Sequence, residues 1–376
     1  MEWTPATAVD HIGEIPARYV AAPATTAECA ALLSEAARAG LAVGIRGNGT
    51  KLDWGLPPRR LDLLVDTTRL AGVVEHAAGD LIAIVRAGTA LDTLDFGSQH
   101  LALDPPPGAT VGGTVALGTS GPRRLLHGTA RDLLIGITVV RPDGRVTRSG
   151  GKVVKNVAGY DLGKLYTGSY GTLGLITECV FRLHPVPAAR AVVTTQVSRE
   201  ALGALLAAIR AEQVVPSAVE LDRPGDGPVT VAVLVEGTAT GVHDRAAQLE
   251  KVTGGTASAD LPSWWSRYPW QPGETGVKLT APLSRVAALT EPGVRGSAGA
   301  GVLYARLTDD VPARLDRMRA AATAAGGHAV VLTAPPEVRD RIDVWGPVPG
   351  LALMRRVKDR FDPGHRFAPG RFVGGI

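Results

Sequence analysis

Four glycine-rich segments lie within the first 180 residues of this 376-residue chain, and they restrict its fold more than any other feature. They are residues 47–50 (GNGT), 105–121 (PPPGATVGGTVALGTSG), 127–132 (HGTARD) and 168–177 (GSYGTLGLIT). Glycine costs about 0.5–1 kcal/mol relative to alanine in regular structure, so its repeated use indicates backbone that takes positive φ or approaches a ligand closely. Backbone N–H groups in such segments form concavities that bind anions. The sequence therefore predicts a site whose backbone holds a pyrophosphate group.

The first glycine segment follows a predicted buried strand at residues 41–46. Gly44 and Gly49 have the spacing of a P-loop, but Thr50 precedes Lys51, which reverses the order that the motif requires. In a dinucleotide-binding βαβ unit the glycines lead into a helix, whereas KLDWGLPPRR contains a glycine and two prolines that cannot begin one. The segment therefore argues against both of these common nucleotide sites.

Strand and helix patterns divide the chain near residue 187. Thr25 and Glu28 predict a capped helix that ends before Gly40. Residues 61–187 are then a series of short apolar strands, and the Asp-Gly pair in RPDGRV predicts a hairpin turn. After residue 188 the pattern restarts as β-α-β-β-α and partly repeats, which is typical of a ferredoxin-like domain on one antiparallel sheet. These patterns indicate an α+β fold.

The composition is that of an ordinary soluble chain, with 45% apolar and 20% charged residues. A net charge of +4 is too small to indicate a nucleic-acid partner. We expect no signal peptide and no transmembrane helix, because the N-terminus lacks an apolar core and no apolar run reaches about 18 residues. Cys29 and Cys179 lie far apart, and the eight histidines form no local pair, so we expect no metal site and a cytoplasmic location.

Four motifs make the chain similar to a known family. RGNGTKLDWG, PPGATVGGTVALGTSGPRR, KNVAGYDLGKLYTGSYGTLGLITE and FDPGHRFAPGRF resemble the flavin domain of the vanillyl-alcohol-oxidase / p-cresol-methylhydroxylase (PCMH) superfamily. Within it, the chain resembles the FAD-binding subunits of bacterial glycolate oxidases. The resemblance implies a two-subdomain PCMH-type FAD-binding domain over residues 1–187 and a ferredoxin-like cap over 188–345. A C-terminal segment, 346–376, would pack back on the first domain.

The resemblance also implies which residues bind FAD. The backbone of residues 47–50 would hold the pyrophosphate, and residues 107–114 would form a second wall beside the flavin. The full set of expected FAD-binding residues is Arg46, Gly47, Asn48, Gly49, Thr50, Pro107, Gly108, Ala109, Thr110, Gly112, Gly113, Thr114, Ser120, Gly121, Gly128, Asp132, Gly171, Thr172, Gly174, Ile176 and Arg371. Relatives with covalent flavin often carry histidine where this chain has Thr50, so the expected FAD is non-covalent; Cys29 and Cys179 are the alternative attachment points.

The usual catalytic complement of this superfamily is missing. Relatives related to D-lactate dehydrogenase share an HxGDGNxH metal motif, but GAGVLYARL in its place contains no histidine, and Tyr170 stands where they commonly carry glutamate. The remaining candidates are Arg123 and Arg124, which could bind a carboxylate or flank FAD, His127, which could act as a base, and Tyr304. The alternatives to these functional roles are that the arginines are solvated and that the histidine is structural. Lys155, Asn156 and Asp161 would either brace the flavin loop or meet substrate.

The function that these features favour is that of the FAD-binding subunit of a glycolate oxidase complex, oxidising glycolate to glyoxylate. The resemblance implies a larger FAD-linked catalytic subunit and an iron–sulfur subunit as partners, with membrane contact only through them. Two alternatives stay open at this point: a self-sufficient FAD-dependent dehydrogenase of another 2-hydroxy acid, and a non-catalytic flavoprotein that relays electrons.

Overall fold

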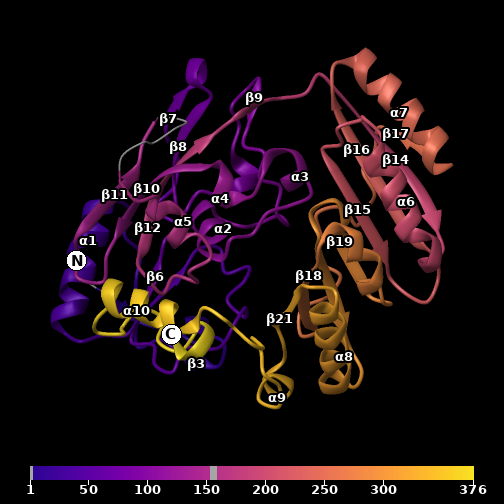
Figure 1. Ribbon diagram of the computed structural model, residues 1–376. Coiled ribbons are helices and arrows are strands. Elements are labelled where there is room, and N and C mark those ends of the chain that lie inside the picture. The colour runs from indigo at the N-terminus through magenta and orange to yellow at the C-terminus, as the bar shows by residue number, and fades with distance from the viewer. Residues whose placement is uncertain (1–2, 153–158) are drawn as a thin grey trace. The chain divides into compact units, whose positions relative to one another are not determined.

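The computed structural model describes residues 3–152 and 159–376, and the chain forms two compact units. The first unit comprises Met1–Ser120, Thr129–Pro185 and Pro347–Ile376, and the second comprises Gly121–Gly128 and Val186–Gly346. The C-terminal segment, yellow in Figure 1, therefore returns to the first unit after the chain has passed through the second. The short excursion at Gly121–Gly128 had no signal in the sequence.

A mixed four-stranded sheet begins the first unit. Three parallel strands, β4 (Tyr19–Ala21), β6 (Leu63–Asp66) and β5 (Val43–Arg46), lie side by side, and β1 (Thr4–Pro5) pairs antiparallel with β4. The helix α1 (Thr26–Arg38) connects β4 to β5, and its predicted N-cap forms: the Thr25 hydroxyl accepts the Glu28 N–H at 3.1 Å. The Glu28 carboxylate accepts the Ala24 N–H at 2.8 Å, which satisfies another donor at this helix end.

The second sheet of the first unit has five antiparallel strands. In sheet order these are β11 (Val146–Gly150), β10 (Leu134–Val140), β12 (Leu175–Arg182), β8 (Ile82–Arg86) and β7 (Val73–Ala77). The Asp-Gly pair turns β10 into β11, as predicted, with Gly144 at φ +84°. The helices of this part are α2 (Val111–Leu117), α4 (Ala130–Leu133), α5 (Leu162–Tyr166) and α10 (Leu351–Phe361). Two strand pairs, β2 (His11–Ile12) with β3 (Ile15–Pro16) and β9 (Gln99–His100) with β13 (His184–Pro185), complete it.

One hydrophobic core joins both sheets of the first unit. It comprises the buried face of α1 (Cys29, Leu32, Leu33 and Ala36), strand residues of both sheets and Phe367 of the C-terminal segment. Val43 and Phe367 form a parallel bridge: the Val43 N–H donates to the Arg366 carbonyl at 2.7 Å, and the Ala368 N–H donates to the Val43 carbonyl at 2.8 Å. The last residues of the chain thus extend the sheet at β5.

The second unit is one eight-stranded antiparallel sheet. In sheet order its strands are β17 (Thr256–Ser258), β14 (Ala189–Val197), β16 (Val229–Gly237), β15 (Ala218–Arg223), β19 (Val294–Ser297), β20 (Val302–Leu307), β18 (Thr275–Thr280) and β21 (His328–Thr333). Each half has the ferredoxin-like strand order, and the halves join edge to edge through β15 and β19. The helices α6 (Arg199–Ala211) and α7 (Ala239–Thr253) pack on the first half, and α8 (Val311–Ala324) packs on the second (Figure 1). The short helices α3 (Arg124–His127) and α9 (Pro336–Arg339) also belong here.

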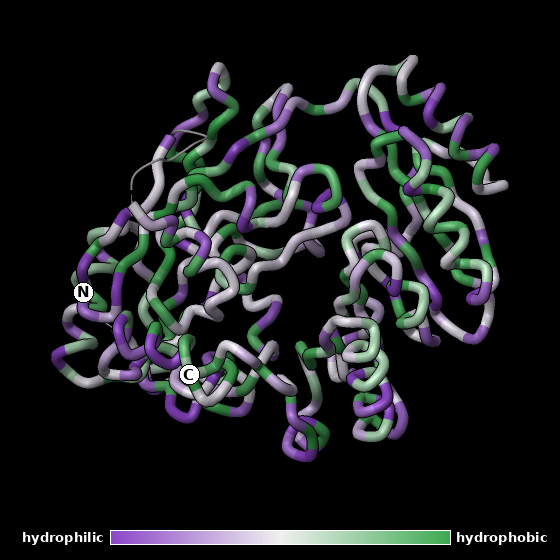
Figure 2. The backbone as a smooth tube through the Cα atoms, viewed as in Figure 1, coloured by the Kyte–Doolittle hydropathy of each residue, from purple (hydrophilic) through white to green (hydrophobic). Residues whose placement is uncertain are grey.

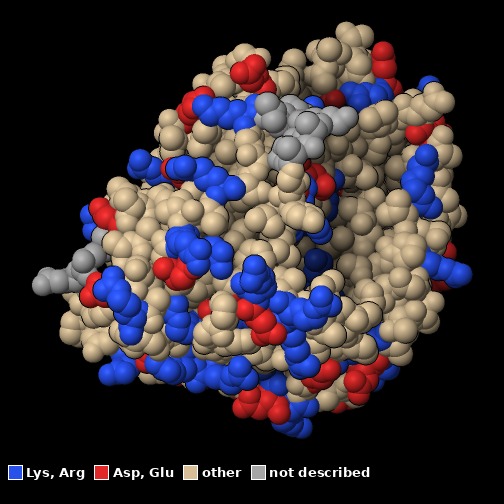
Figure 3. Space-filling model, turned by 60° about the vertical axis from the view of Figure 1, so that its left-hand side comes forward, with Lys and Arg blue, Asp and Glu red and all other residues tan. Residues whose placement is uncertain are grey.

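The distribution of side chains agrees with this layered architecture. The central strands of each unit are mostly apolar, whereas connecting loops are more often polar (Figure 2). On the face shown in Figure 3, lysine and arginine are interspersed with acidic residues, as the small net charge of +4 leads one to expect. Within residues 3–152 and 159–376, the structure contains no helix of the length and apolarity needed to span a bilayer.

Candidate functional site

A cavity of the first unit is lined by residues from three of the four glycine-rich segments. The end of β5 and the loop after it form one wall, residues 109–117 form a second, and residues 170–176 form a third. The C-terminal segment contributes one residue. The lining consists of Ile45, Gly47, Asn48, Gly49, Thr50, Lys51, Leu52, Thr67, Ala87, Ala109, Thr110, Gly112, Gly113, Ala116, Leu117, Tyr170, Gly171, Gly174, Ile176 and Arg371.

The glycines of the first two walls are required by close packing. A Cβ atom on Gly47 would lie 2.4 Å from the Thr110 hydroxyl oxygen, and one on Gly112 would lie 2.8 Å from the Ala87 Cβ. The Asn48 side chain also joins the walls, because its Nδ2 donates to the Gly108 carbonyl at 3.0 Å. These contacts set the width of the cavity through backbone positions, and no side chain larger than hydrogen fits at the two glycines.

The second glycine segment contains the helix α2, for which no helix was predicted. The Thr110 hydroxyl accepts the Gly113 N–H at 3.2 Å, and Gly118 ends the helix at φ +62°. The third wall is fastened to this helix, since the Tyr170 N–H donates to the Ala116 carbonyl at 2.8 Å. Tyr170 itself takes φ +57°, an uncommon conformation for a residue with a side chain. A backbone hydrogen bond therefore joins the second and third walls of the cavity.

Two buried cations line the cavity, Lys51 at 7% exposure and Arg371 at 6%. The Arg371 Nη2 donates to the Lys51 carbonyl at 3.3 Å, and the Arg371 Nη1 is buried with no partner among the described residues. The Lys51 ammonium lies 3.3 Å from the Thr50 hydroxyl and 5.8 Å from the centre of the Trp54 ring. Burial lowers the pKa of Lys51 to about 8 and the pKa of Arg371 to about 10. The cavity thus offers positive charge and an unused donor.

The cavity brings together many of the predicted cofactor residues but not all of them. Those that line it are Gly47, Asn48, Gly49, Thr50, Ala109, Thr110, Gly112, Gly113, Gly171, Gly174, Ile176 and Arg371. The predicted residues outside the lining are Arg46, Pro107, Gly108, Thr114, Ser120, Gly121, Gly128, Asp132 and Thr172. Lys51 and Tyr170 line it although neither was predicted to bind the cofactor. The position of Lys51 directly after the glycine loop was the available signal.

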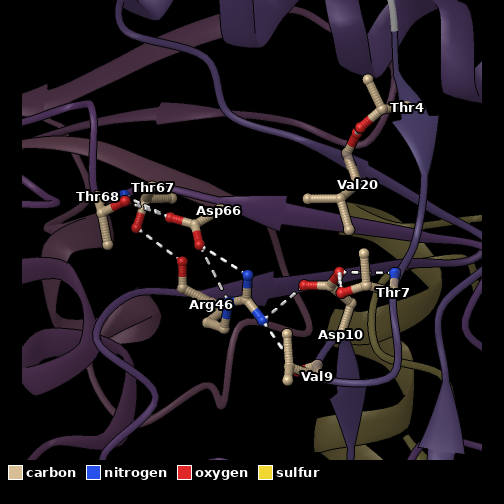
Figure 4. Close-up of polar contacts among 9 residues, drawn as sticks. All are labelled: Thr4, Thr7, Val9, Asp10, Val20, Arg46, Asp66, Thr67 and Thr68. Atoms are coloured by element: carbon tan, nitrogen blue, oxygen red, sulfur yellow. Dashed lines mark hydrogen bonds and ion pairs between the residues drawn. The ribbon is translucent and has the colours of Figure 1, made fainter.

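Arg46 has a structural role that its position beside the glycine loop did not suggest. Its guanidinium forms ion pairs with Asp10 at 3.0 Å and Asp66 at 2.9 Å (Figure 4). Asp66 also accepts the Thr68 N–H at 2.9 Å, and Asp10 accepts the Thr7 N–H at 2.9 Å. The Arg46 side chain thus ties β5 to β6 and to the N-terminal segment, so a contact with the cofactor would come from its backbone.

Ser120 and Asp132 brace the short helix α4. The Ser120 hydroxyl accepts the Ala130 N–H at 2.9 Å. The Asp132 carboxylate accepts the Thr129 N–H at 2.8 Å and the Thr129 hydroxyl at 2.7 Å, which completes a capping box. Both side chains therefore stabilise local backbone, and their proposed contact with the cofactor stays a prediction.

Three of the catalytic candidates are held in the second unit by specific contacts. Arg123 pairs with the buried Glu236, with its Nη2 2.6 Å from the carboxylate. Arg124 donates to the Gly121 carbonyl at 2.9 Å, and its Nη2 lies 3.4 Å from the Tyr304 hydroxyl. The structure thus brings Arg124 and Tyr304 together, although they are 180 residues apart.

Of the remaining candidates, His127 is joined to this group through its backbone, because its N–H donates to the Arg123 carbonyl at 3.0 Å. His127 is the last residue of α3, and Asp161 is an exposed residue 3.9 Å from Lys164. Lys155 and Asn156 lie outside the described residues. Of the described residues that line the cavity, none is a histidine, aspartate or glutamate. The described lining is therefore rich in groups that bind an anion and includes no carboxylate or imidazole base.

Comparison with known proteins agrees with this geometry. Residues 17–150 match a family model described as an FAD binding domain. The glycolate oxidase subunit GlcE of Escherichia coli is 38% identical over 161 residues, which are 41% of this chain and 45% of the relative. The D-lactate dehydrogenase of Archaeoglobus fulgidus is 37% identical over 171 residues, 44% of this chain and 38% of the relative. The chain therefore spans less than half the length of these curated relatives.

A solved structure extends the likeness to both units. An alkyldihydroxyacetonephosphate synthase matches with a TM-score of 0.71 at 17% identity, covering 94% of this chain and 77% of the synthase. At this identity the match concerns the fold alone, and it agrees with the α+β architecture expected from the sequence.

The residues of the cavity fit FAD. The close glycine contacts leave backbone beside the ligand space, and the unpartnered Arg371 Nη1 is a donor that an anion would satisfy. Lys51 is a second buried cation of the lining. The cofactor is FAD, and residues 17–150, in the first unit, match the FAD-binding domain that the family model describes.

Proposed function

We propose that this chain is the FAD-binding subunit of a glycolate oxidase (glycolate dehydrogenase) complex. The complex oxidises glycolate to glyoxylate, and the two electrons pass through FAD to an iron–sulfur subunit. A larger FAD-linked subunit completes the complex and contributes catalytic groups. The observation that carries the proposal is a cofactor cavity with two buried cations and, among the described lining residues, no histidine or carboxylate. The likeness to a protein named glycolate oxidase subunit GlcE supports it.

The chemistry of the proposed reaction shows why a second subunit is expected. Oxidation of glycolate removes two electrons and two protons, so the site needs a base for the hydroxyl proton and a clamp for the substrate carboxylate. Bound FAD supplies the two-electron acceptor. In this chain, Lys51, Arg371 and the backbone of residues 47–50 would hold the cofactor, while Gly47 and Gly112 keep the walls close enough to do so.

A self-sufficient dehydrogenase for another 2-hydroxy acid is the second candidate. The contact between Arg124 and Tyr304 favours it, because a guanidinium beside a phenol is a suitable partner for a carboxylate. In that case Arg124 would bind the substrate carboxylate and Tyr304 would bridge to it. A third candidate, a flavoprotein that only relays electrons, needs the cofactor cavity but neither of these residues.

The absorbance spectrum of the purified chain, recorded before and after anaerobic addition of glycolate, distinguishes the self-sufficient dehydrogenase from the subunit and the electron relay. For the proposed subunit we expect a flavin spectrum that stays oxidised with glycolate alone and bleaches when the larger subunit is added. Bleaching by the isolated chain would refute the subunit proposal and favour the self-sufficient enzyme. D-Lactate added in parallel tests the other class of substrate named among the relatives.

A further inference from the structure

We propose that Lys51 and Arg371 form a two-cation clamp on the FAD pyrophosphate, and that Lys51 takes up a proton when the cofactor binds. The inference rests on FAD occupying the cavity and not on the identity of the substrate. It assigns Lys51, which the glycine-loop pattern did not include, as a cofactor-binding residue. It also links cofactor affinity to pH through one side chain.

The geometry of the two cations supports the clamp. Both side chains line the same cavity, and each is more than nine-tenths buried. The hydrogen bond of 3.3 Å from Arg371 Nη2 to the Lys51 carbonyl fixes the guanidinium against the glycine loop. The Nη1 of Arg371 is left buried without a partner among the described residues, and a buried guanidinium donor is costly to leave unpaired. An anion in the cavity would satisfy it.

The surroundings explain why the lysine needs an anion. On the same segment as Lys51, Asp53 is exposed, and its charge only partly offsets the lowering of the Lys51 pKa by burial. The face of the Trp54 ring lies 5.8 Å from the Lys51 ammonium. From the C-terminal segment, Arg371 lines the same cavity, and residues 170–176 present Tyr170. No carboxylate among the described lining residues reaches into the cavity to compensate. A doubly negative pyrophosphate between two cations is therefore the complementary ligand.

Proton uptake follows from burial. With a pKa of about 8, close to half of the Lys51 side chains are neutral at pH 8 in the free protein. An adjacent anion favours the charged form and raises this pKa. Binding at pH 8 should then take up about half a proton per FAD, and at a pH of about 6 almost none, because Lys51 is already protonated.

Calorimetric titration of the flavin-free full chain with FAD tests this, using buffers of different ionisation enthalpy to count protons. Lys51→Arg keeps the charge but cannot lose its proton, so it should bind FAD with near wild-type affinity and no uptake at pH 8. Lys51→Met should bind about 10- to 100-fold more weakly, also with no uptake. Lys251→Met, at an exposed lysine of α7, is the matched control and should behave like the wild type. ADP, which carries the pyrophosphate without the flavin, should show the same uptake as FAD.

The outcomes separate cleanly. Uptake that persists in Lys51→Arg, or wild-type FAD affinity in Lys51→Met, would overturn the role of Lys51. Proton uptake on binding of FAD but not on binding of ADP would overturn the pyrophosphate as the ligand of the clamp. If Lys51→Met fails to fold, the wild type and Lys51→Arg still decide the proposal by the proton count alone. A wild-type chain that binds no FAD would overturn the cofactor site itself, whereas the glycolate experiment above addresses only the substrate.

Discussion

Lys358 gives the sharpest test of how the C-terminal segment is held in the first unit. The side chain, in α10, is fully buried, and its ammonium lies 2.8 Å from the Asp362 carboxylate. It also donates to the Thr172 carbonyl at 2.8 Å and to the Phe367 carbonyl at 2.9 Å. One ammonium thus connects α10, the third wall of the cavity and the strand-like end of the chain. Lys358→Met removes all three contacts while keeping a long apolar stem.

The magnitude follows from what the substitution leaves behind. The Asp362 side chain is only 1% exposed, its Oδ1 already has no partner among the described residues, and only the Phe367 N–H at 2.8 Å would still donate to its Oδ2. Removing one member of a buried ion pair costs about 3–5 kcal/mol, because the remaining charge is uncompensated. The double variant Lys358→Met/Asp362→Leu removes that charge as well, and we expect it to recover most of the loss.

Urea denaturation followed by tryptophan fluorescence measures the free energy of unfolding of both variants. Arg145→Met is the matched control: Arg145 also lies 2.8 Å from a carboxylate, that of Asp143, but the arginine is 75% exposed, so the change should be within about 1 kcal/mol. A Lys358→Met protein as stable as that control, or a double variant less stable than the single one, would refute the role given to this ion pair.

Three further predictions concern the cavity and the thiols. Gly47→Ala should weaken FAD binding at least about 10-fold in a fluorescence titration, because its Cβ would lie 2.4 Å from the Thr110 hydroxyl, whereas Gly79→Ala, with open space around its Cβ, should not. The pKa of Lys51 falls from 10.5 to about 8 on folding, so between these pH values the unfolded chain binds more protons than the folded chain. The free energy of unfolding of the flavin-free protein should therefore rise by up to about 3 kcal/mol as the pH rises through that window. Urea denaturation should show this rise in the wild type and not in Lys51→Met. Burial raises the pKa of Cys29 to about 12 and raises that of Cys179 further, so neither thiol should react with a thiol reagent before the protein unfolds. Acid precipitation should then release all FAD into the supernatant. Flavin that stays with the pellet would contradict non-covalent binding.

Local signals in the sequence predicted much of the fold because they act over a few residues. The cap at Thr25, the Asp-Gly turn and the alternating strands of both units all have short-range causes. The pattern missed β17 and β19, which are three and four residues long, and β19 includes a glycine. It also missed α2, where Gly112 and Gly113 oppose helix formation and packing against Ala87 outweighs that cost.

The site was harder to predict, for a physical reason. A lysine or arginine in a loop is usually solvated, so the burial of Lys51 and Arg371 could not be inferred without the tertiary structure that encloses them. The contact between residues 51 and 371 joins segments more than 300 positions apart, and no local pattern records such a distance. The resemblance supplied Arg371 through its motif, but it supplied no reason to single out Lys51.

The bridge between Val43 and Phe367 has a consequence for the order in which the protein is made. Ribosomes release the chain from its N-terminus, so both parts of the second unit, Gly121–Gly128 and Val186–Gly346, emerge before the residues that complete the sheet at β5. The second unit can reach its fold during translation, whereas the first unit must wait for the last ten or so residues of the chain. A stalled or prematurely terminated message would therefore yield a folded insert attached to an unfinished flavin domain that lacks Arg371.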